Sequence, residues 1–241
     1  MKYFAPSQFC DRNTQPHIMT LIALASISAL AMNIFLPSLP SMAAYYNTTA
    51  SIMSLSVAIY LGASALVQLI SGPISDHIGR RPVILISLVL FICAYLAIIW
   101  APNAKTFLTL RFVQAFAATT VVLARAVVRD TVGENAAASK IAYVTMGMAV
   151  APMIGPGIGG YLDKYFGWQS IFLLLAGLGV CIFILTWFDL GETAPKRKTT
   201  LPNQIIEYKQ LLKSERFWGY CLASALGSGS FFIYLGGGAV Y

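Results

Sequence analysis

Charged side chains are scarce in this sequence. Only 10% of its 241 residues are Asp, Glu, Lys or Arg, and 58% are hydrophobic. Ordinary globular chains are roughly 25% charged and 45–50% apolar. A soluble domain needs a surface that water tolerates, and this composition leaves too few polar side chains to cover one. The composition therefore excludes an ordinary soluble domain and predicts a membrane protein.

Residue types that carry out catalysis are also few. The two histidines, His17 and His77, lie outside the long apolar runs, no His-Glu-x-x-His motif occurs, and no pair of carboxylates falls within a run. The four cysteines lack the spacing of a metal or redox site. We therefore expect no metal and no cofactor. A membrane enzyme, such as an intramembrane protease, is the alternative that these absences disfavour most.

Long apolar runs make up most of the chain. A helix needs about 20 apolar residues to cross a bilayer, and lipid requires that backbone polar groups be satisfied within the segment. The runs show no alternation of polar and apolar residues, which excludes the strands of a membrane barrel. The predicted fold class is an all-α membrane protein. Six complete runs, and a seventh that meets the end of the sequence, cover approximately residues 18–39, 52–71, 82–100, 107–128, 141–161, 169–189 and 217–241.

The net charge of +7 is distributed unevenly between the loops. With a cytoplasmic N-terminus, two of the 16 basic residues (Lys105 and Lys164) lie outside, two (Arg111 and Arg125) lie within the fourth run, and the other twelve lie on the cytoplasmic side. The positive-inside rule favours this orientation. The basic balance is therefore an orientation signal, and no nucleic-acid partner is expected. A cleaved signal peptide is disfavoured because the first apolar run continues through Leu39.

The longest polar stretch separates the sixth and seventh runs. Its first part, Glu192-Thr-Ala-Pro-Lys-Arg-Lys198, is typical of a flexible cytoplasmic linker. Its second part, around residues 205–213, has apolar residues on one helical side and charged residues on another. A helix lying on the inner membrane surface and a solvated linker helix explain that pattern equally well. The expected organisation is an N-terminus (1–17), a six-helix bundle (18–190), a linker with an interfacial helix (191–216) and a seventh span (217–241).

A ridge of small residues runs along the fifth span. Gly147, Ala151, Gly155 and Gly159 recur every four residues, which lets a neighbouring helix approach closely. Static packing is the simplest explanation. Two prolines and five glycines within residues 147–160 exceed what packing requires and favour a sliding or bending interface. The partial G-x-G-x-x-G match at 155–160 is accidental, since no strand precedes it.

The segment Gly72-Pro-Ile-Ser-Asp-His-Ile-Gly-Arg-Arg-Pro-Val83 is expected to be a short loop between the second and third spans. Asp76 stands four residues before Arg80. Opposite charges concentrated in such a loop can form a latch that is made and broken. A solvated positive-inside loop is the alternative, but it would need neither the aspartate nor this glycine spacing.

Several of these segments resemble motifs of a known family. The pattern G-x-x-x-D-x-x-G-R-R at 72–81 resembles the signature of the major facilitator superfamily, and Gly147 to Gly160 resembles the fifth-helix motif of its proton-driven antiporters. Further segments resemble the Bcr/CflA-type drug exporters. These are Leu36-Pro-Ser-Leu-Pro40, Tyr60, Gln68, Arg111-Phe-Val-Gln114, Val128-Arg-Asp130 and Ser228-Gly-Ser-Phe-Phe-Ile-Tyr-Leu-Gly-Gly-Gly238.

The resemblance implies a fold and a function. Members of this family have twelve spans in two six-helix halves, so this chain is expected to be a fragment with one half, the linker and one further helix. The implied protein is a monomeric exporter in the bacterial inner membrane. It would exchange small, largely apolar drug-like compounds for protons by alternating access. Proton-coupled uptake of a nutrient, which the antiporter-like ridge disfavours, and an inactive truncation product are the alternatives.

The resemblance also assigns roles to residues. Asp76, Arg80 and Arg81 would join Asp130 in a conformational switch. The antiporter motif would consist of Gly147, Gly155, Pro156, Gly159 and Gly160. The substrate cavity would be lined by Asn33, Tyr60, Gln68, Arg111, Gln114, Phe231, Phe232 and Tyr234.

Two positions within the spans carry particular weight. An arginine within a membrane is energetically costly and is expected to be functional. Arg111 resembles the motif arginine that this superfamily links to proton transfer. Arg125 can extend its side chain toward the cytoplasmic interface. Asn33 stands where Bcr/CflA-type exporters typically have an aspartate, and an amide cannot titrate. Asn33 is expected to hydrogen-bond to substrate or to Arg111, with simple packing as the alternative.

Overall fold

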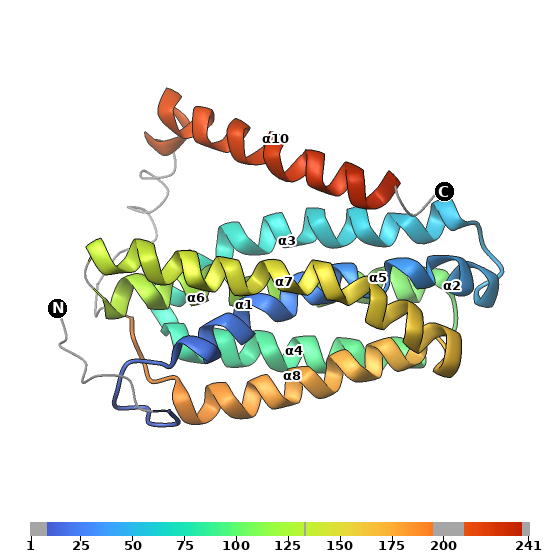
Figure 1. Ribbon diagram of the computed structural model, residues 1–241, viewed down its shortest axis with the longest axis horizontal. Coiled ribbons are helices and arrows are strands. Elements are labelled where there is room, and N and C mark those ends of the chain that lie inside the picture. The colour runs from blue at the N-terminus through green and yellow to red at the C-terminus, as the bar shows by residue number, and fades with distance from the viewer. Residues whose placement is uncertain (1–8, 133, 195–209, 238–241) are drawn as a thin grey trace. The chain divides into compact units, whose positions relative to one another are not determined.

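The computed structural model describes residues 9–132, 134–194 and 210–237, with only the backbone at 134, 135 and 231–237. Every described element is a helix (Figure 1). The chain divides into two units, Met1–Arg197 and Lys198–Tyr241. The second contains α10 (Glu215–Gly237). The first contains α1 (Ile18–Asn33), η1 (Leu36–Ser38), α2 (Leu39–Tyr45), α3 (Ala50–Ile78), α4 (Arg80–Ile99), α5 (Ala104–Gln114), η2 (Ala115–Ala117), α6 (Ala118–Thr131), α7 (Glu134–Phe166) and α8 (Gln169–Asp189).

Six helical stretches of the described chain are long and apolar enough to cross a membrane. They correspond to the first six apolar runs, and the predicted all-α membrane fold is confirmed. The sixth run matches α8, whereas most other helices extend several residues beyond the apolar sequence. The stretches are Ile18–Tyr45, Ala50–Ile78, Arg80–Ile99, Ala104–Thr131, Ala136–Phe166 and Gln169–Asp189.

The expected loop over residues 72–83 is wrong. Helix α3 continues through Gly72 and Pro73 to Ile78, and Gly79 alone separates it from α4. A proline removes one hydrogen bond of a helix, and the remaining bonds of α3 keep it continuous. Gly79 adopts φ 113°, a left-handed conformation that suits glycine and ends the helix. Pro82 lies in the first turn of α4, where a backbone N–H has no helical partner in any case.

Two of the six spans are interrupted. The first is divided between α1 and α2 by η1, which contains Pro37. The fourth is divided between α5 and α6 by η2, which begins directly after Gln114. Interrupted helices occur within membranes where other parts of the protein satisfy the released backbone groups. Both interruptions lie next to polar residues that the sequence predicts to be functional.

The ridge of small residues on α7 packs against α1 of the same bundle. A Cβ added at Gly159 would overlap the carbonyl oxygen of Ile34, and one at Gly155 would lie 3.2 Å from Leu30 Cδ1. Figure 1 shows the two helices running beside each other. The absence of side chains along this ridge therefore sets the distance between α1 and α7.

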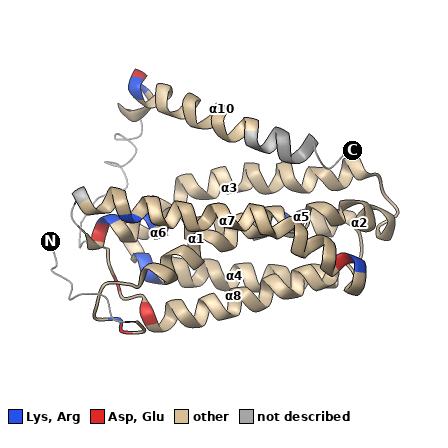
Figure 2. Ribbon diagram, viewed as in Figure 1, with Lys and Arg blue, Asp and Glu red and all other residues tan. Residues whose placement is uncertain are grey.

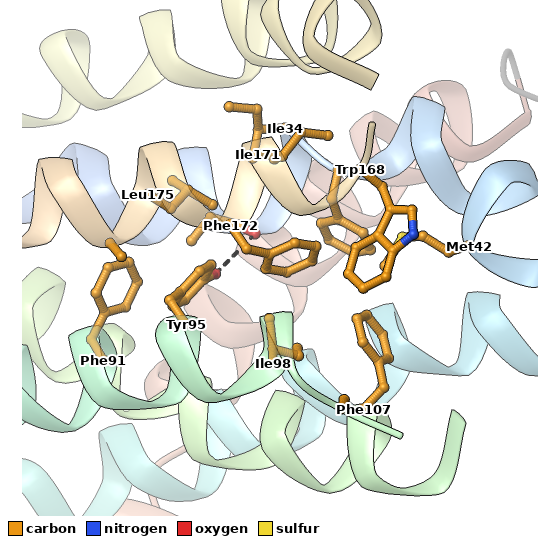
Figure 3. Packing of buried hydrophobic residues seen from close by; sticks show 14 of the residues in the cluster. Ile34, Met42, Phe91, Tyr95, Ile98, Phe107, Trp168, Ile171, Phe172 and Leu175 are labelled. Atoms are coloured by element: carbon orange, nitrogen blue, oxygen red, sulfur yellow. Dashed lines mark hydrogen bonds between the residues drawn. The ribbon is translucent and has the colours of Figure 1, made fainter. Parts of the chain in front are cut away.

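Aromatic side chains fill one part of the core (Figure 3). The rings of Phe91 and Tyr95 on α4 lie 4.2 Å apart, and Tyr95 contacts Phe172 of α8 with ring centres 5.7 Å apart. Trp168 and Phe107 pack on the other side of Phe172. Such contacts contribute specific geometry in addition to burial of apolar surface. They fix α4 and α8 against the start of α5.

Most charged residues of the first unit lie toward the ends of its helices and in the connections between them (Figure 2). One end, called the basic end below, contains Arg12, Arg80 and Arg81, which contact groups at the ends of α6 and α8. Moving a charge into the middle of a bilayer is costly, so this distribution is the one that a spanning bundle requires. Arg111 of α5 is an exception, because its side chain is buried inside the bundle.

We predict that Gly159→Ala lowers the stability of the bundle by about 1–3 kcal/mol, the usual cost of overpacking, because the Ile34 carbonyl must move. Gly157→Ala is the matched control, since a Cβ there meets no described atom within 4 Å. Both changes raise helix propensity equally. Thermal unfolding in detergent should separate the two variants. Equal midpoints would show that the α1–α7 approach does not limit stability.

Candidate functional site

Arg80 joins three helices at the basic end. It begins α4, and its Nη1 forms an ion pair with Asp76 Oδ1 of α3 at 2.7 Å. Its Nε pairs with Asp130 Oδ2 of α6 at 3.0 Å. Nη1 also donates to the hydroxyl of Ser75. The charges that the sequence singled out, Asp76, Arg80 and Asp130, therefore meet in one place, here called the charge cluster.

The charge cluster is partly shielded from solvent. The exposed fractions of the side chains are 11% for Arg80, 14% for Asp130 and 37% for Asp76. Charge-assisted hydrogen bonds of this kind are stronger than neutral ones. For the more buried pair, Arg80–Asp130, removing one partner costs about 3–5 kcal/mol because the other charge is left unpaired, whereas the pair with the more exposed Asp76 contributes up to about 1 kcal/mol. The cluster is therefore stable only while α3, α4 and α6 keep their relative positions.

Arg81 contacts a different element. Its guanidinium lies 4.9 Å from the centre of the Trp187 ring, and its Nη2 donates to the Trp187 carbonyl oxygen at 3.2 Å. Arg12 lies 5.4 Å from the centre of the same ring. Trp187, near the end of α8, thus receives two cations that are distant in sequence. The sequence predicts Arg81 as a switch residue, but both ion pairs of the described residues with Asp76 and Asp130 are formed by Arg80.

Glu192 is a residue of this site that sequence reasoning missed. Its carboxylate accepts the backbone N–H groups of Arg80 at 2.9 Å and Arg81 at 3.3 Å. A carboxylate at a helix N-terminus satisfies free donors and interacts favourably with the helix dipole. The sequence placed Glu192 in a flexible linker. One sequence signal indicated that another residue caps α4. Gly79, at the N-cap, has no side chain to accept the free N–H groups, and the first turn of α4 contains no acidic residue.

Asp189 fixes the N-terminal segment to the same end. Its side chain is fully buried at the end of α8 and accepts the backbone N–H groups of Cys10 at 3.0 Å and His17 at 2.9 Å. A buried carboxylate requires such partners. The segment before α1 is therefore attached to the region that carries Trp187 and Glu192.

A second polar group lies inside the bundle around Arg111. The side chain is 0% exposed, and its Nη1 donates to Gln114 Oε1 at 2.7 Å. The guanidinium carbon lies 3.7 Å from the centre of the Phe35 ring and 5.5 Å from that of Tyr60. The hydroxyls of Tyr60 and Ser28 are hydrogen-bonded at 3.1 Å. Three residues expected to line a cavity, Tyr60, Arg111 and Gln114, are therefore neighbours.

The other residues expected around the cavity differ in their surroundings. Asn33 is buried and donates to the Ala29 carbonyl oxygen of its own helix at 2.8 Å, while its Oδ1 has no partner in the described part of the chain. Gln68 is exposed on α3. The structure describes only the backbone of Phe231, Phe232 and Tyr234, which lie in α10, and it does not describe their side chains. Within the described ranges, no group of His, Cys, Asp or Glu has the arrangement of a metal site.

Comparison with known proteins gives one family and several relatives. Residues 21–241 match the Major Facilitator Superfamily. The chain is 34% identical to the Chloramphenicol resistance protein of Pseudomonas aeruginosa, over 90% of this chain and 52% of that protein. It is 28% identical to a Bicyclomycin resistance protein homolog of Haemophilus influenzae, over 95% of this chain and 59% of that protein. It is 29% identical to the Multidrug transporter MdfA of Yersinia pestis, over 94% of this chain and 56% of that protein. The chain thus spans about half the length of these curated relatives.

We predict that Gly79→Ala detaches Glu192 from α4. An added Cβ would overlap the Glu192 carboxylate, and the φ of 113° is strained for alanine. Loss of a helix cap costs about 0.5–2 kcal/mol, so the amides of Arg80 and Arg81 should exchange hydrogen faster. Gly72→Ala is the control, because its Cβ meets no described atom within 4 Å. Unchanged protection in Gly79→Ala would mean that Glu192 does not hold this helix end.

Proposed function

We propose that this chain, which belongs to the major facilitator superfamily, forms the N-terminal half, the linker and the next helix of an exporter that exchanges small, largely apolar drug-like compounds for protons. The family and the multi-pass helical architecture are shown by the sequence match and the six spans. Relatives with drug-resistance names support export of drugs as the activity. The observation that carries the proposal is the charge cluster, because a transporter needs a contact that differs between its states.

The charge cluster is suited to be a conformational latch. Arg80 contacts acidic residues of two other helices, so a small rotation of α3 or α6 would break one of its ion pairs. Two arrangements that differ by a few kcal/mol can be exchanged by substrate and proton binding. In the alternating-access scheme, the cluster would hold the transporter closed on its own side of the membrane.

The proposed orientation places the basic end in the cytoplasm. Arg12, Arg80 and Arg81 lie at that end, and the positive-inside rule favours a cytoplasmic position for them. The N-terminal segment, which Asp189 holds at the same end, would then be cytoplasmic as well. We place the protein in the bacterial inner membrane and expect it to act as a monomer.

The proposed substrate cavity lies on the side of Tyr60, Arg111 and Gln114. Asn33 and Gln68 would belong to the same cavity, and the roles that the resemblance implies for Phe231, Phe232 and Tyr234 stay predictions from the sequence. Cavities for drug-like compounds combine apolar and aromatic walls with a few polar groups that orient the ligand. The aromatic rings of Phe35 and Phe107 around Arg111 support this composition.

The antiporter motif would act as a bending element rather than as a contact with the second half. Gly155 and Gly159 pack on α1, so Pro156 and Gly160 would let α7 bend while this contact is kept. Motion of α1 and α7 as a pair would then accompany the change of access to the two sides of the membrane.

We predict that Asp76→Asn reduces drug export while the protein still inserts into the membrane. Loss of a partly exposed ion pair costs up to about 1 kcal/mol, which changes the population of the latched state roughly fivefold. Drug accumulation should be measured in cells with matched protein levels. Asp163→Asn is the control, since Asp163 bonds to Ser41 away from the cluster. Export by Asp76→Asn at the wild-type rate would contradict the latch.

A further inference from the structure

Arg111 carries a positive charge within the bundle without a carboxylate beside it. Its side chain is 0% exposed, and both ion pairs of the described residues involve Arg80 instead. A guanidinium stays protonated in proteins, so this charge cannot be removed by titration. Asn33, the last residue of α1 and two positions before Phe35, is an amide and supplies no counter-charge.

The surroundings of Arg111 have too few hydrogen-bond acceptors. The Tyr95 hydroxyl interacts with the Arg111 guanidinium, but Nε and Nη2 of Arg111 and Nε2 of Gln114 lack a hydrogen bond of good geometry among the described groups. The amide oxygen of Gln114 is already used by Arg111 Nη1. Three buried donor atoms of two adjacent residues thus lack a well-formed hydrogen bond. Buried polar atoms normally have partners, so this group requires an acceptor from elsewhere.

Two features stabilise the cation and leave those donors free. The rings of Phe35, Tyr60 and Phe107 lie 3.7, 5.5 and 6.0 Å from the guanidinium carbon. Arg111 also lies in the last turn of α5, where the helix dipole favours a positive charge. Aromatic rings and the helix dipole stabilise the positive charge, but they do not accept hydrogen bonds from all of the guanidinium N–H groups. The result is a guanidinium that can still bind a carboxylate.

Phe35 is itself buried in the core, so a ligand would reach Arg111 only if this ring moved. This ring covers the guanidinium and lies between the end of α1 and the start of η1, where the first span is interrupted. Residues at such an interruption are not held by a continuous helical ladder. Displacement of the Phe35 ring would expose the unpaired donors on Arg111 and Gln114.

We propose that Arg111 and Gln114 receive an anionic group of the transported compound, so that the exporter selects compounds with a carboxylate and rejects cations. This inference rests on the proposed function and specifies its substrate class. A carboxylate would supply the missing acceptors and the missing counter-charge together. A cationic compound would meet a like charge in a region of low dielectric constant, where repulsion is strong.

The test compares two dyes that share a ring system and differ in charge. Fluorescein carries a carboxylate, and rhodamine 123 is its cationic analogue. Binding of each to the purified full-length transporter in lipid nanodiscs is measured by fluorescence polarisation. The wild type should bind fluorescein more tightly by about tenfold or more, the effect expected of a hydrogen bond to a charged group. Arg111→Gln should remove this preference by weakening fluorescein alone.

Three further variants separate binding from folding. Arg125→Gln removes the other arginine of the fourth span, which is only partly buried, and should leave the preference unchanged. Asn33→Asp introduces a buried negative charge and should weaken fluorescein binding. If the Arg111→Gln protein does not insert into the membrane, the Arg111→Lys variant tests the inference instead, because it keeps the positive charge but loses the paired N–H donors of the guanidinium. It should weaken fluorescein selectively and to a smaller extent.

The outcomes distinguish this inference from the function on which it rests. A wild-type protein that exports an uncharged apolar drug, yet binds both dyes equally or neither, contradicts the inference alone. An equal loss for both dyes in Arg111→Gln also contradicts it, since that pattern indicates a purely structural arginine. Failure of the wild type to export any drug contradicts the proposed function instead.

Discussion

The pairing of Arg80 is the interaction on which the arrangement of the basic end depends. One guanidinium contacts Asp76 and Ser75 of α3 and Asp130 of α6, while the Arg80 backbone N–H is held by Glu192. These contacts join the second, third and fourth spans to the segment that follows the sixth. Because an unpaired buried charge is costly, none of these elements can move without exchanging one partner for another.

The positive charges of the two buried arginines, Arg80 and Arg111, are stabilised in different ways. Arg80 lies near a helix end and has full ionic partners, so its charge contributes to a defined arrangement. Arg111 lies deep in the bundle with only Gln114 and aromatic rings around it. A membrane-embedded protein keeps such a charge at a cost. One arginine is therefore suited to hold a conformation, and the other is suited to bind a partner that the first six spans do not provide.

Much of the architecture could be predicted from the sequence, because spans are set by apolar length and charge placement. The meeting of Asp76, Arg80 and Asp130 was also predicted, from spacing and from motif resemblance. The continuation of α3 through Gly72 and Pro73 was not, since local proline and glycine signals do not weigh the hydrogen bonds of the rest of a helix. The cap by Glu192 depends on tertiary approach, which leaves no local pattern at its own position.

The coupling between Arg80 and Asp130 tests the central claim most directly. Drug export should be measured for Arg80→Gln, Asp130→Asn and the double variant, each at matched levels in the membrane. If the two residues act as one latch, each single variant lowers the export rate and the double variant is no worse than the poorer single one. Wild-type export by either single variant, or losses that multiply in the double variant, would contradict the claim that this ion pair controls transport.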